Sequence, residues 1–217
     1  MRIVLLGAPG AGKGTQCKRI AAKYGLMHLS SGDILRQERA AGSNLGKKAQ
    51  SYMDAGELVP DKIIVEMMAG AIKKAADNGF VLDGFPRTVN QAVELDKALT
   101  LAGQKINAVL NLEVNDQLIV RRMAGRRSCP KCGAVYHLEN LKPKVEGICD
   151  NDGDKLVQRP DDNAKVVANR LKTYHQQTEP VVAYYKNNNT VYDINANRTA
   201  DEVTAAIFEN LDAMVSV

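Results

Sequence analysis

Short apolar runs and longer amphipathic stretches alternate along most of the chain, which is typical of a parallel β-sheet with helices on both faces. The apolar runs predict five strands, at 2–6, 27–29, 80–83, 107–113 and 190–194. The amphipathic stretches predict helices, at about 13–24, 34–40, 45–55, 60–76, 89–102, 115–127, 161–186 and 199–214. We therefore expect an α/β fold with a parallel five-stranded sheet flanked by helices.

Residues that begin or bend helices refine the C-terminal half. Asp161 and Asp162 are expected to cap the long helix that reaches about Lys186. Pro180 lies inside that helix and should bend it, because proline cannot donate the backbone hydrogen bond of the helix. Residues 187–189, a run of three asparagines, are expected to form a turn.

The alternation breaks between 128 and 160. This stretch holds three of the four cysteines, three prolines and several glycines, and it has no helical periodicity. Apolar residues around Val135, Tyr136 and Leu138 suggest short strands. We therefore expect this region to form a small subdomain inserted into the α/β fold.

The segment Gly7–Thr15, Gly-Ala-Pro-Gly-Ala-Gly-Lys-Gly-Thr, joins the first predicted strand to the first predicted helix. A glycine-rich loop in this position can turn its backbone N–H groups around phosphate oxygens, and the lysine adds a mobile positive charge. The residue after the lysine is Gly14, so the hydroxyl that would face a magnesium ion comes one position later, at Thr15. A glycine turn without a ligand is the alternative, and the flanking strand and helix argue against it.

The segment Asp83–Arg87 begins at the last residue of the third predicted strand and continues into the loop after it. Ligands of parallel sheets lie at the carboxyl ends of the strands, so Asp83 is placed to hold a magnesium ion directly or through water, and Arg87 faces the same rim as Lys13. Taken singly, Asp83 could be a helix cap and Arg87 a solvated charge. Further arginines could contact phosphate in pairs of hydrogen bonds, namely Arg36, Arg122, Arg126, Arg159 and Arg170. Arg126 and Arg159 flank the cysteine-rich insertion, which could close as a lid.

The insertion also carries two similar cysteine-containing turns. Cys129 and Cys132 form a C-x-x-C-G unit, and Cys149 begins a second unit with Asp152 in the place of its second cysteine. Sixteen residues separate the units, which is within zinc-site spacing, and zinc accepts three thiolates and a carboxylate in a closed, structural site. Rival fourth ligands are His137, Asp150 and Asp154.

Composition narrows the class of protein. The 217 residues are 45% hydrophobic and 25% charged, and the formal net charge of +4 is too small to imply a nucleic-acid partner by itself. No apolar run approaches the roughly 20 residues that span a bilayer, and no signal peptide is recognisable at the N-terminus. We expect a cytoplasmic protein with reduced thiols, in which Cys17 is buried and inert.

Six motifs in order carry a resemblance to a known family: 7–15, Ser30-Ser31-Gly32-Asp33, Gly56-Glu57-Leu58-Val59-Pro60-Asp61, Asp83-Gly84-Phe85-Pro86-Arg87-Thr88, Gly125-Arg126-Arg127 and Arg159-Pro160-Asp161-Asp162. Over essentially its whole length the chain resembles the adenylate kinases, a family of nucleoside monophosphate kinases, in their bacterial form with a long zinc-carrying lid. The shifted hydroxyl at Thr15 is usual in that family, and Ser31 stands where threonine is commoner.

The resemblance implies three parts: a CORE of the P-loop NTPase type at 1–29, 60–125 and 164–217, a helical AMP-binding insertion at 30–59 and a β LID at 126–163. On the ATP side it implies Gly10, Ala11, Gly12, Lys13, Gly14, Thr15, Arg126, Val135, Tyr136 and the backbone near Arg198. On the AMP side it implies Ser31, Arg36, Glu57, Leu58, Val59, Gly84, Phe85, Pro86, Arg87 and Gln91, with Gln91 reading the adenine edge. Arg159 and Arg170 would bridge the phosphates, and the zinc ligands would be Cys129, Cys132, Cys149 and Asp152.

The implied reaction is Mg-ATP plus AMP to two ADP, reversibly, for adenine nucleotide homeostasis. The AMP phosphate is already an anionic nucleophile, so no general base is needed and charge stabilisation dominates. Lys13, Arg87, Arg122, Arg126, Arg159 and Arg170 would supply it, with Asp83 near the magnesium water shell. We expect a monomer without nucleic-acid or membrane partners. A UMP or CMP kinase is an alternative, and a zinc-containing P-loop protein that binds nucleic acid is a weaker one.

Overall fold

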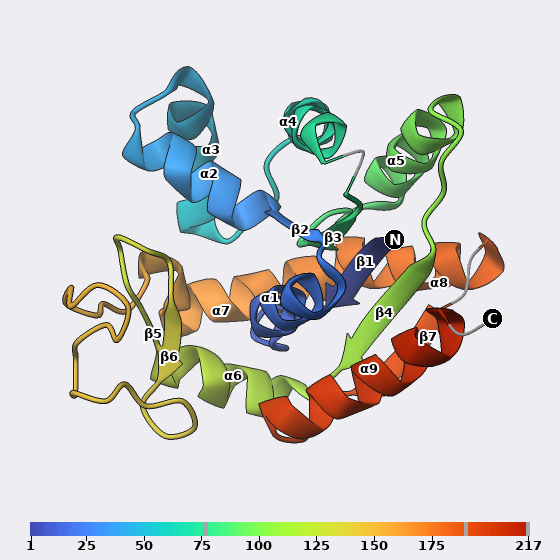
Figure 1. The fold of residues 1–217 in the computed structure, drawn as a ribbon. Helices are drawn as coiled ribbons and strands as arrows, with labels where there is room; N and C mark the ends of the chain where they lie inside the picture. The colour runs from blue at the N-terminus through green and yellow to red at the C-terminus, as the bar shows by residue number, and fades with distance from the viewer. Residues whose placement is uncertain (76–77, 189–190, 216–217) are drawn as a thin grey trace.

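The computed structural model, which describes residues 1–75, 78–188 and 191–215, has the predicted α/β fold (Figure 1). Five parallel strands form one sheet in the order β2-β3-β1-β4-β7 within the described residues. Their bounds are Arg2–Gly7 (β1), Met27–Ser30 (β2), Phe80–Asp83 (β3), Ala108–Glu113 (β4) and Val191–Asn195 (β7). Each predicted strand is confirmed to within a residue or so. The expected start of the last strand at residue 190 lies outside the described residues.

Alternation along the buried strands fills two cores, one on each face of the sheet. In β1, Ile3 and Leu5 point to the face covered by α1 (Lys13–Tyr24) and α9 (Ala200–Val215). Val4 and Leu6 point to the opposite face, which is covered by α4 (Asp61–Lys74), α5 (Val89–Leu101) and α8 (Glu179–Asn188). The two helical layers are visible on either side of the sheet in Figure 1. Because both faces of β1 are buried, the strand reads as a continuous apolar run.

A helical hairpin, α2 (Ser31–Ala40) and α3 (Asn44–Ala55), follows β2. The side chain of Ser30 accepts a hydrogen bond from the Asp33 amide and caps α2. Gly46 lets the two helices approach closely, because a Cβ at that position would lie 2.3 Å from the Glu38 carbonyl oxygen. In Figure 1 the hairpin projects from the strand edge beside α4. Its position places the start of α2 at the carboxyl end of β2.

The long C-terminal helix begins later than predicted. Asp161 and Asp162 lie in a 3₁₀ turn, η1 (Pro160–Asp162), and the prediction that they cap the helix is wrong. Asn163 is the cap, because its Oδ1 accepts a hydrogen bond from the Val166 amide at 3.0 Å. The helix runs through α7 (Ala164–Thr173), a π-helical turn (η2, Tyr174–Thr178) and α8. The π turn ends just before Pro180, where the α-helical hydrogen bond is missing.

Two other expected helix boundaries need comment. The helix predicted to reach 127 is α6 (Asp116–Gly125), which ends early because Arg126 already belongs to strand β5 (Arg126–Ser128). The expected end of the helix at residue 76 lies outside the described residues. The asparagine turn predicted at 187–189 is wrong at its first two positions, because Asn187 and Asn188 are the last residues of α8, and residue 189 lies outside the described residues.

The segment after α6 forms the predicted β structure. Strand β5 pairs antiparallel with β6 (Val135–His137), and Ser128 also bridges to Val157. A small core of Cys129, Tyr136, Cys149 and Leu156 lies between these strands and the turns that follow. Figure 1 shows this segment at one end of the molecule, beside α6 and α7. Among the described residues, no helix is long and apolar enough to cross a membrane.

Candidate functional site at the carboxyl edge of the sheet

The glycine-rich loop turns directly from β1 into α1. Gly12 forms the helix N-cap with a φ of 100°, a conformation that strongly favours glycine. The Lys13 ammonium donates hydrogen bonds back to the carbonyls of Gly7 (2.6 Å) and Ala8 (2.8 Å), so it lies over the loop. Burial lowers the pKa of Lys13 to about 8, although the nearby Asp83 carboxylate opposes the shift. The loop therefore presents backbone N–H groups, a helix N-terminus and a cation at one place.

Gly14, the departure from the general phosphate-loop motif, faces Asp83. A Cβ at position 14 would lie 3.3 Å from Asp83 Oδ2, so a larger residue would press on that carboxylate. The Asp83 side chain is 14% exposed and comes from the end of β3, as the sequence predicted. Thr15, two residues after Lys13, is half-buried in the first turn of α1. The loop, the acid and the hydroxyl thus share one rim of the sheet.

A cleft opens at this rim and is lined by residues from five separate parts of the chain. It brings together most of the AMP-side residues implied by the sequence with Lys13 and Arg170, namely Ser31, Arg36, Glu57, Leu58, Val59, Gly84, Pro86, Arg87 and Gln91. Phe85 is the exception, because its ring is 2% exposed and packs in the core beneath the cleft. The turn after β3 is tied to α2, since Ser31 Oγ donates to the Gly84 carbonyl at 2.6 Å.

The amide of Gln91 is held from both ends. Its Oε1 accepts a hydrogen bond from the Arg87 backbone at 2.8 Å, and its Nε2 donates to Asp61 Oδ1 at 2.7 Å. Asp61 also accepts hydrogen bonds from Thr88 and Asn90, each at 3.0 Å. Asp61 therefore fixes which end of the amide carries the donor. Sequence reasoning missed this role and treated Asp61 only as the start of a helix.

Further arginines lie on the opposite side of the cleft, where Arg170 lines it and Arg159 is close enough to Arg36 for their charges to interact. Burial lowers the pKa of Arg159 to about 10, and repulsion from Arg36 and Arg126 adds to the shift. Burial also lowers the pKa of Arg170 to about 10, with Asp161 opposing and Arg126 and Arg87 adding to it. These arginines therefore lie close enough to repel one another, which is the electrostatic signature of a site for a polyanion.

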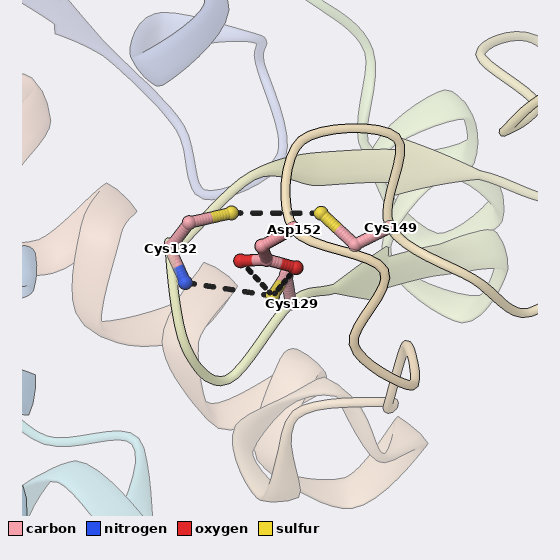
Figure 2. A group of neighbouring side chains, drawn as sticks. All are labelled: Cys129, Cys132, Cys149 and Asp152. Carbon is pink, nitrogen blue, oxygen red and sulfur yellow. Dashed lines mark hydrogen bonds between the residues drawn. The ribbon is translucent and has the colours of Figure 1, made fainter.

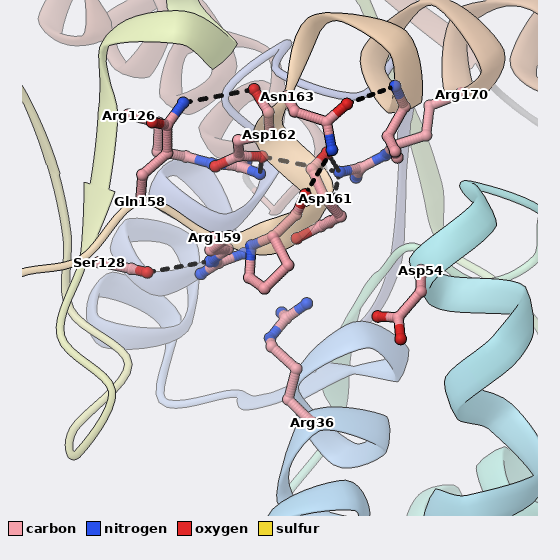
Figure 3. A network of polar contacts seen from close by, with 12 residues as sticks. Arg36, Asp54, Arg126, Ser128, Gln158, Arg159, Asp161, Asp162, Asn163 and Arg170 are labelled. Carbon is pink, nitrogen blue, oxygen red and sulfur yellow. Dashed lines mark hydrogen bonds and ion pairs between the residues drawn. The ribbon is translucent and has the colours of Figure 1, made fainter.

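Two acids beside the cysteine-rich insertion balance part of this charge (Figure 3). Two of the guanidinium nitrogens of Arg126, Nε and Nη2, donate to the carboxylate of Asp162, which is fully buried. Arg170 donates to Asp161 Oδ2 at 2.5 Å and lies 3.8 Å from Asp162 Oδ1. Arg159 instead contacts a neutral group, the Ser128 hydroxyl, at 3.2 Å. The pairs of arginine and aspartate around the two hinges were not predicted. Their residues were in view, because Arg159, Asp161 and Asp162 belong to the motif at 159–162 and Arg126 to the motif at 125–127.

Arg122, expected to stabilise the transferring group, and Arg198, on the implied ATP side, lie outside the cleft-lining set. Arg122 donates to the carbonyls of Ala196 (2.9 Å) and Arg198 (3.1 Å), so Arg122 and Arg198 lie together between α6 and the loop after β7. Val135 is half-buried on β6, and the Tyr136 ring packs into the small core of the insertion.

The cysteine turns form a second candidate site, shown in Figure 2. Ligand atoms of Cys129, Cys132, Cys149 and Asp152 lie within 4.8 Å of one another. The Cys132 and Cys149 sulfurs are 3.5 Å apart, and Cys129 Sγ is 3.3 Å from Asp152 Oδ2. The Asp154 amide donates to Asp152 and holds the pKa of its carboxyl at about 2, so the carboxylate is ionised.

The rival ligands point elsewhere. Asp150 accepts a hydrogen bond from the Lys144 amide at 2.8 Å, and Asp154 accepts one from the Lys155 amide at 3.1 Å. His137 uses Nδ1 to accept from the amides of Glu139 and Asn140. Three thiols and one carboxylate are compatible with a closed tetrahedral site for a structural metal.

The parallel sheet, the phosphate loop at the end of β1 and the basic cleft beside it define a P-loop kinase of the nucleoside monophosphate type. The adenylate kinase family model matches residues 5–190. Relatives named adenylate kinase include one from Lachnospira eligens, 50% identical over 212 residues that cover 97% of this chain and 100% of the relative. Another, from Caldicellulosiruptor saccharolyticus, is 52% identical over 188 residues, which are 86% of this chain and 87% of the relative. The chain belongs to the adenylate kinase family and is an enzyme, a nucleotide-binding phosphotransferase.

Proposed function

We propose that this chain transfers the terminal phosphoryl group of Mg-ATP to AMP, giving two ADP, in a reversible reaction. The single observation that carries the proposal is the cleft in which Lys13 of the phosphate loop faces Arg36, Arg87 and Arg170 from other elements. Two phosphate chains need such a set of cations on both sides of the transferring group.

The ATP side is proposed to be the phosphate loop and the insertion above it. The amides of residues 10–15 hold the β- and γ-phosphates, and Lys13 exchanges its two backbone carbonyls for phosphate oxygens. Magnesium, the family's cofactor with ATP, would be held by phosphate oxygens, Thr15 and water, with Asp83 in its outer shell. Arg126, Val135, Tyr136 and the backbone near Arg198 are assigned to the remaining ATP contacts.

The AMP side is proposed to be the turn after β3 with the helical hairpin. Arg36 and Arg87 bind the AMP phosphate, because Arg87 is enclosed by the turn and points at the rim beside Lys13. Gln91 reads the adenine edge, since its fixed amide offers a donor and an acceptor side by side. The backbone at 57–59 and the Ser31 hydroxyl complete the pocket.

The residues act by placing and neutralising charge. The AMP phosphate is an anion at neutral pH and attacks in line, so no side chain has to remove a proton. Arg159 and Arg170 are assigned to the bridging phosphates, and Arg122 supports the ATP side through the backbone of the loop after β7. Segments 30–59 and 126–163 are proposed to move as the AMP-binding part and the lid, while the remainder stays as the core, and the protein works as a monomer.

Zinc is proposed as the structural ion of the lid. It would be held by Cys129, Cys132, Cys149 and Asp152, whose ligand atoms already lie within 4.8 Å of one another. A closed site with four protein ligands leaves no position for substrate, so the ion would stabilise a segment whose own core is very small.

A coupled assay of ADP formation, run with ATP and each of AMP, UMP and CMP, tests the activity. We expect turnover with AMP and magnesium, and a fall of roughly 10²–10³ fold in Lys13→Ala and in Arg87→Ala, because each loses one contact to the transferring group. Lys97→Ala is the matched control, since that lysine is exposed on α5, away from the cleft, and pairs with Glu94. Near-normal turnover in Lys13→Ala and Arg87→Ala would contradict the residue assignment, and a preference for UMP or CMP would contradict the acceptor.

A further inference from the structure

Behind the phosphate loop, three side chains of metal-binding type come together from three different elements. They are Cys17 on α1, His28 on β2 and Asp83 at the end of β3, and their ligand atoms lie within 4.8 Å of one another. His28 Nε2 is 3.4 Å from Asp83 Oδ2. Neither Cys17 nor His28 has any part in the phosphoryl transfer described above. The cluster is therefore separate from the four ligands of the lid.

The register of β2 with β3 and the position of α1 bring these three side chains together. In the register of β2 with β3, His28 lies beside Val81 and Ser30 beside Asp83, so His28 and Asp83 project from the same face of the sheet. Helix α1 covers that face, and Cys17 packs there with Val81. Gly14, one turn before Cys17 on the same helix, is the residue whose missing side chain leaves room for Asp83. Cys17 thus lies over the carboxylate.

The spacing fits a small tetrahedral ion. With metal bonds of about 2.0 Å to nitrogen or oxygen and 2.3 Å to sulfur, neighbouring ligand atoms lie roughly 3.3–3.6 Å apart. The distance between His28 and Asp83 already has that value. The three side chains are also shielded, because Cys17 is fully buried and the side chains of His28 and Asp83 are only 16% and 14% exposed.

We propose that Cys17, His28 and Asp83 form a second metal site, specific for a thiophilic divalent cation such as Zn²⁺ or Cd²⁺, with the fourth position taken by water. On binding, the bond between sulfur and metal replaces the bond between sulfur and hydrogen, and the proton leaves to solvent. Burial, with the Asp83 charge adding to it, raises the pKa of the Cys17 thiol, so the thiol holds its proton until an ion arrives.

The charge around the site selects the ion. Lys13 interacts electrostatically with both Cys17 and Asp83, and its positive charge opposes any second cation. An ion must therefore gain enough from the thiolate bond to offset that repulsion. Zn²⁺ and Cd²⁺ do so, whereas Mg²⁺ prefers oxygen ligands and stays on the phosphate side. Given the proposed function of Asp83 beside Mg-ATP, an ion that holds this carboxylate inhibits the enzyme.

Cadmium-113 NMR of the full chain loaded with ¹¹³Cd tests the site without relying on activity. Two resonances are expected, one from three thiolates and a carboxylate in the lid and one from a single thiolate with nitrogen and oxygen. Cys17→Ala should remove only the second resonance, and Cys132→Ser only the first. His28→Gln should weaken the second. A wild-type spectrum with the lid resonance alone, or a second resonance that survives in Cys17→Ala, would overturn the proposal.

Inhibition by Cd²⁺ in the coupled assay, with magnesium in excess, tests whether an ion at this second site blocks the function of Asp83. The concentration for half-inhibition should rise at least tenfold in Cys17→Ala and in His28→Gln, while turnover without Cd²⁺ stays near wild type. Cys17→Ser repeats the test if the alanine variant unfolds at a lower temperature. Equal inhibition of wild type and variants would overturn the link to Asp83. The NMR result stands apart from the proposed kinase reaction, so the two can fail independently.

Discussion

Replacing Asp162 by asparagine should destabilise the protein strongly, because this carboxylate is the buried half of an ion pair. Its side chain is fully buried, and it receives two guanidinium hydrogen bonds from Arg126, whose side chain is 17% exposed. Asparagine keeps the shape but loses the charge, and its amide NH₂ would face the donors of Arg126. Arg170, which lies 3.8 Å from the same carboxylate, would lose a second favourable charge contact.

The expected cost can be worked from this geometry. Removing one partner of a buried pair costs about 3–5 kcal/mol, since the other charge stays in place without compensation. Arg126 retains some access to water, so we take the lower end, about 3 kcal/mol. For a chain of this size, each kcal/mol lowers the unfolding temperature by roughly 2–4 °C. Asp162→Asn should therefore unfold about 6–12 °C below wild type.

Thermal unfolding followed by circular dichroism measures this difference, with metal content held equal in both proteins. Asp54→Asn is the matched control, because Asp54 pairs with Arg39 at 2.8 Å but its side chain is 42% exposed. A surface pair of this kind contributes at most about 1 kcal/mol. If Asp162→Asn shifts the unfolding temperature no more than Asp54→Asn does, the reasoning about the buried pair is refuted.

Three other changes test separate features. Asp61→Asn should reduce the preference in kcat/KM for AMP over other monophosphates by about tenfold. Asparagine cannot accept hydrogen bonds from Gln91 on one side and from Thr88 and Asn90 on the other, so the Gln91 amide loses its fixed orientation. Cys129→Ser should lower the unfolding temperature in calorimetry far more than it lowers turnover at low temperature, because the proposed zinc ion is structural. The ring nitrogens of His175 donate hydrogen bonds to the Glu179 and Asp116 carboxylates, which raises the pKa of His175, so its charged form stabilises the fold at low pH. That contribution is complete below the unfolded pKa and disappears as pH rises through the folded pKa, so His175→Gln should cost stability at about pH 5.5 and little at about pH 8.5.

Each of these has a result that would count against it. Unchanged AMP selectivity in Asp61→Asn would mean that the amide of Gln91 is oriented without the carboxylate. Elemental analysis without zinc in the carefully purified protein would remove the basis of the Cys129 prediction. Equal loss of stability in His175→Gln at both pH values would show that packing, not charge, explains the effect.

The elements that could be predicted from the sequence are those with a local signal. A continuous apolar run identified β1, because both faces of that strand are buried, and the glycine-rich loop after it identified a phosphate site. The paired cysteine turns identified the ligand cluster in the insertion, since their spacing is itself the signal. The strand and the loop depend on residues within a few positions of one another, and each cysteine turn repeats a motif of five residues.

The parts that could not be predicted depend on pairing across long stretches of chain. Arg126 and Asp162 are 36 residues apart, and Gln91 and Asp61 are 30 apart. From the neighbouring sequence alone, Asp61 and Asp162 were both predicted to begin a helix, and for Asp162 that prediction is wrong. An acid near a helix start has the same local pattern whether it caps the helix or pairs with a distant arginine. Only the closure of the insertion between its two hinges distinguishes these cases.

The basic side chains around the cleft fall into two groups, according to whether a carboxylate or a backbone carbonyl holds each one and would have to be displaced by a phosphate. Arg126 and Arg170 are held by carboxylates, so a phosphate must compete with an existing charge or bind alongside it. Arg87 and Lys13 are held by backbone carbonyls, which release a cation to a phosphate at little cost. Replacing Arg126 should thus mainly lower the free energy of unfolding, and replacing Arg87 or Lys13 should mainly lower turnover through lost transition-state stabilisation. The same cluster of charges therefore performs two physical tasks, and the nature of the partner determines which residue performs which.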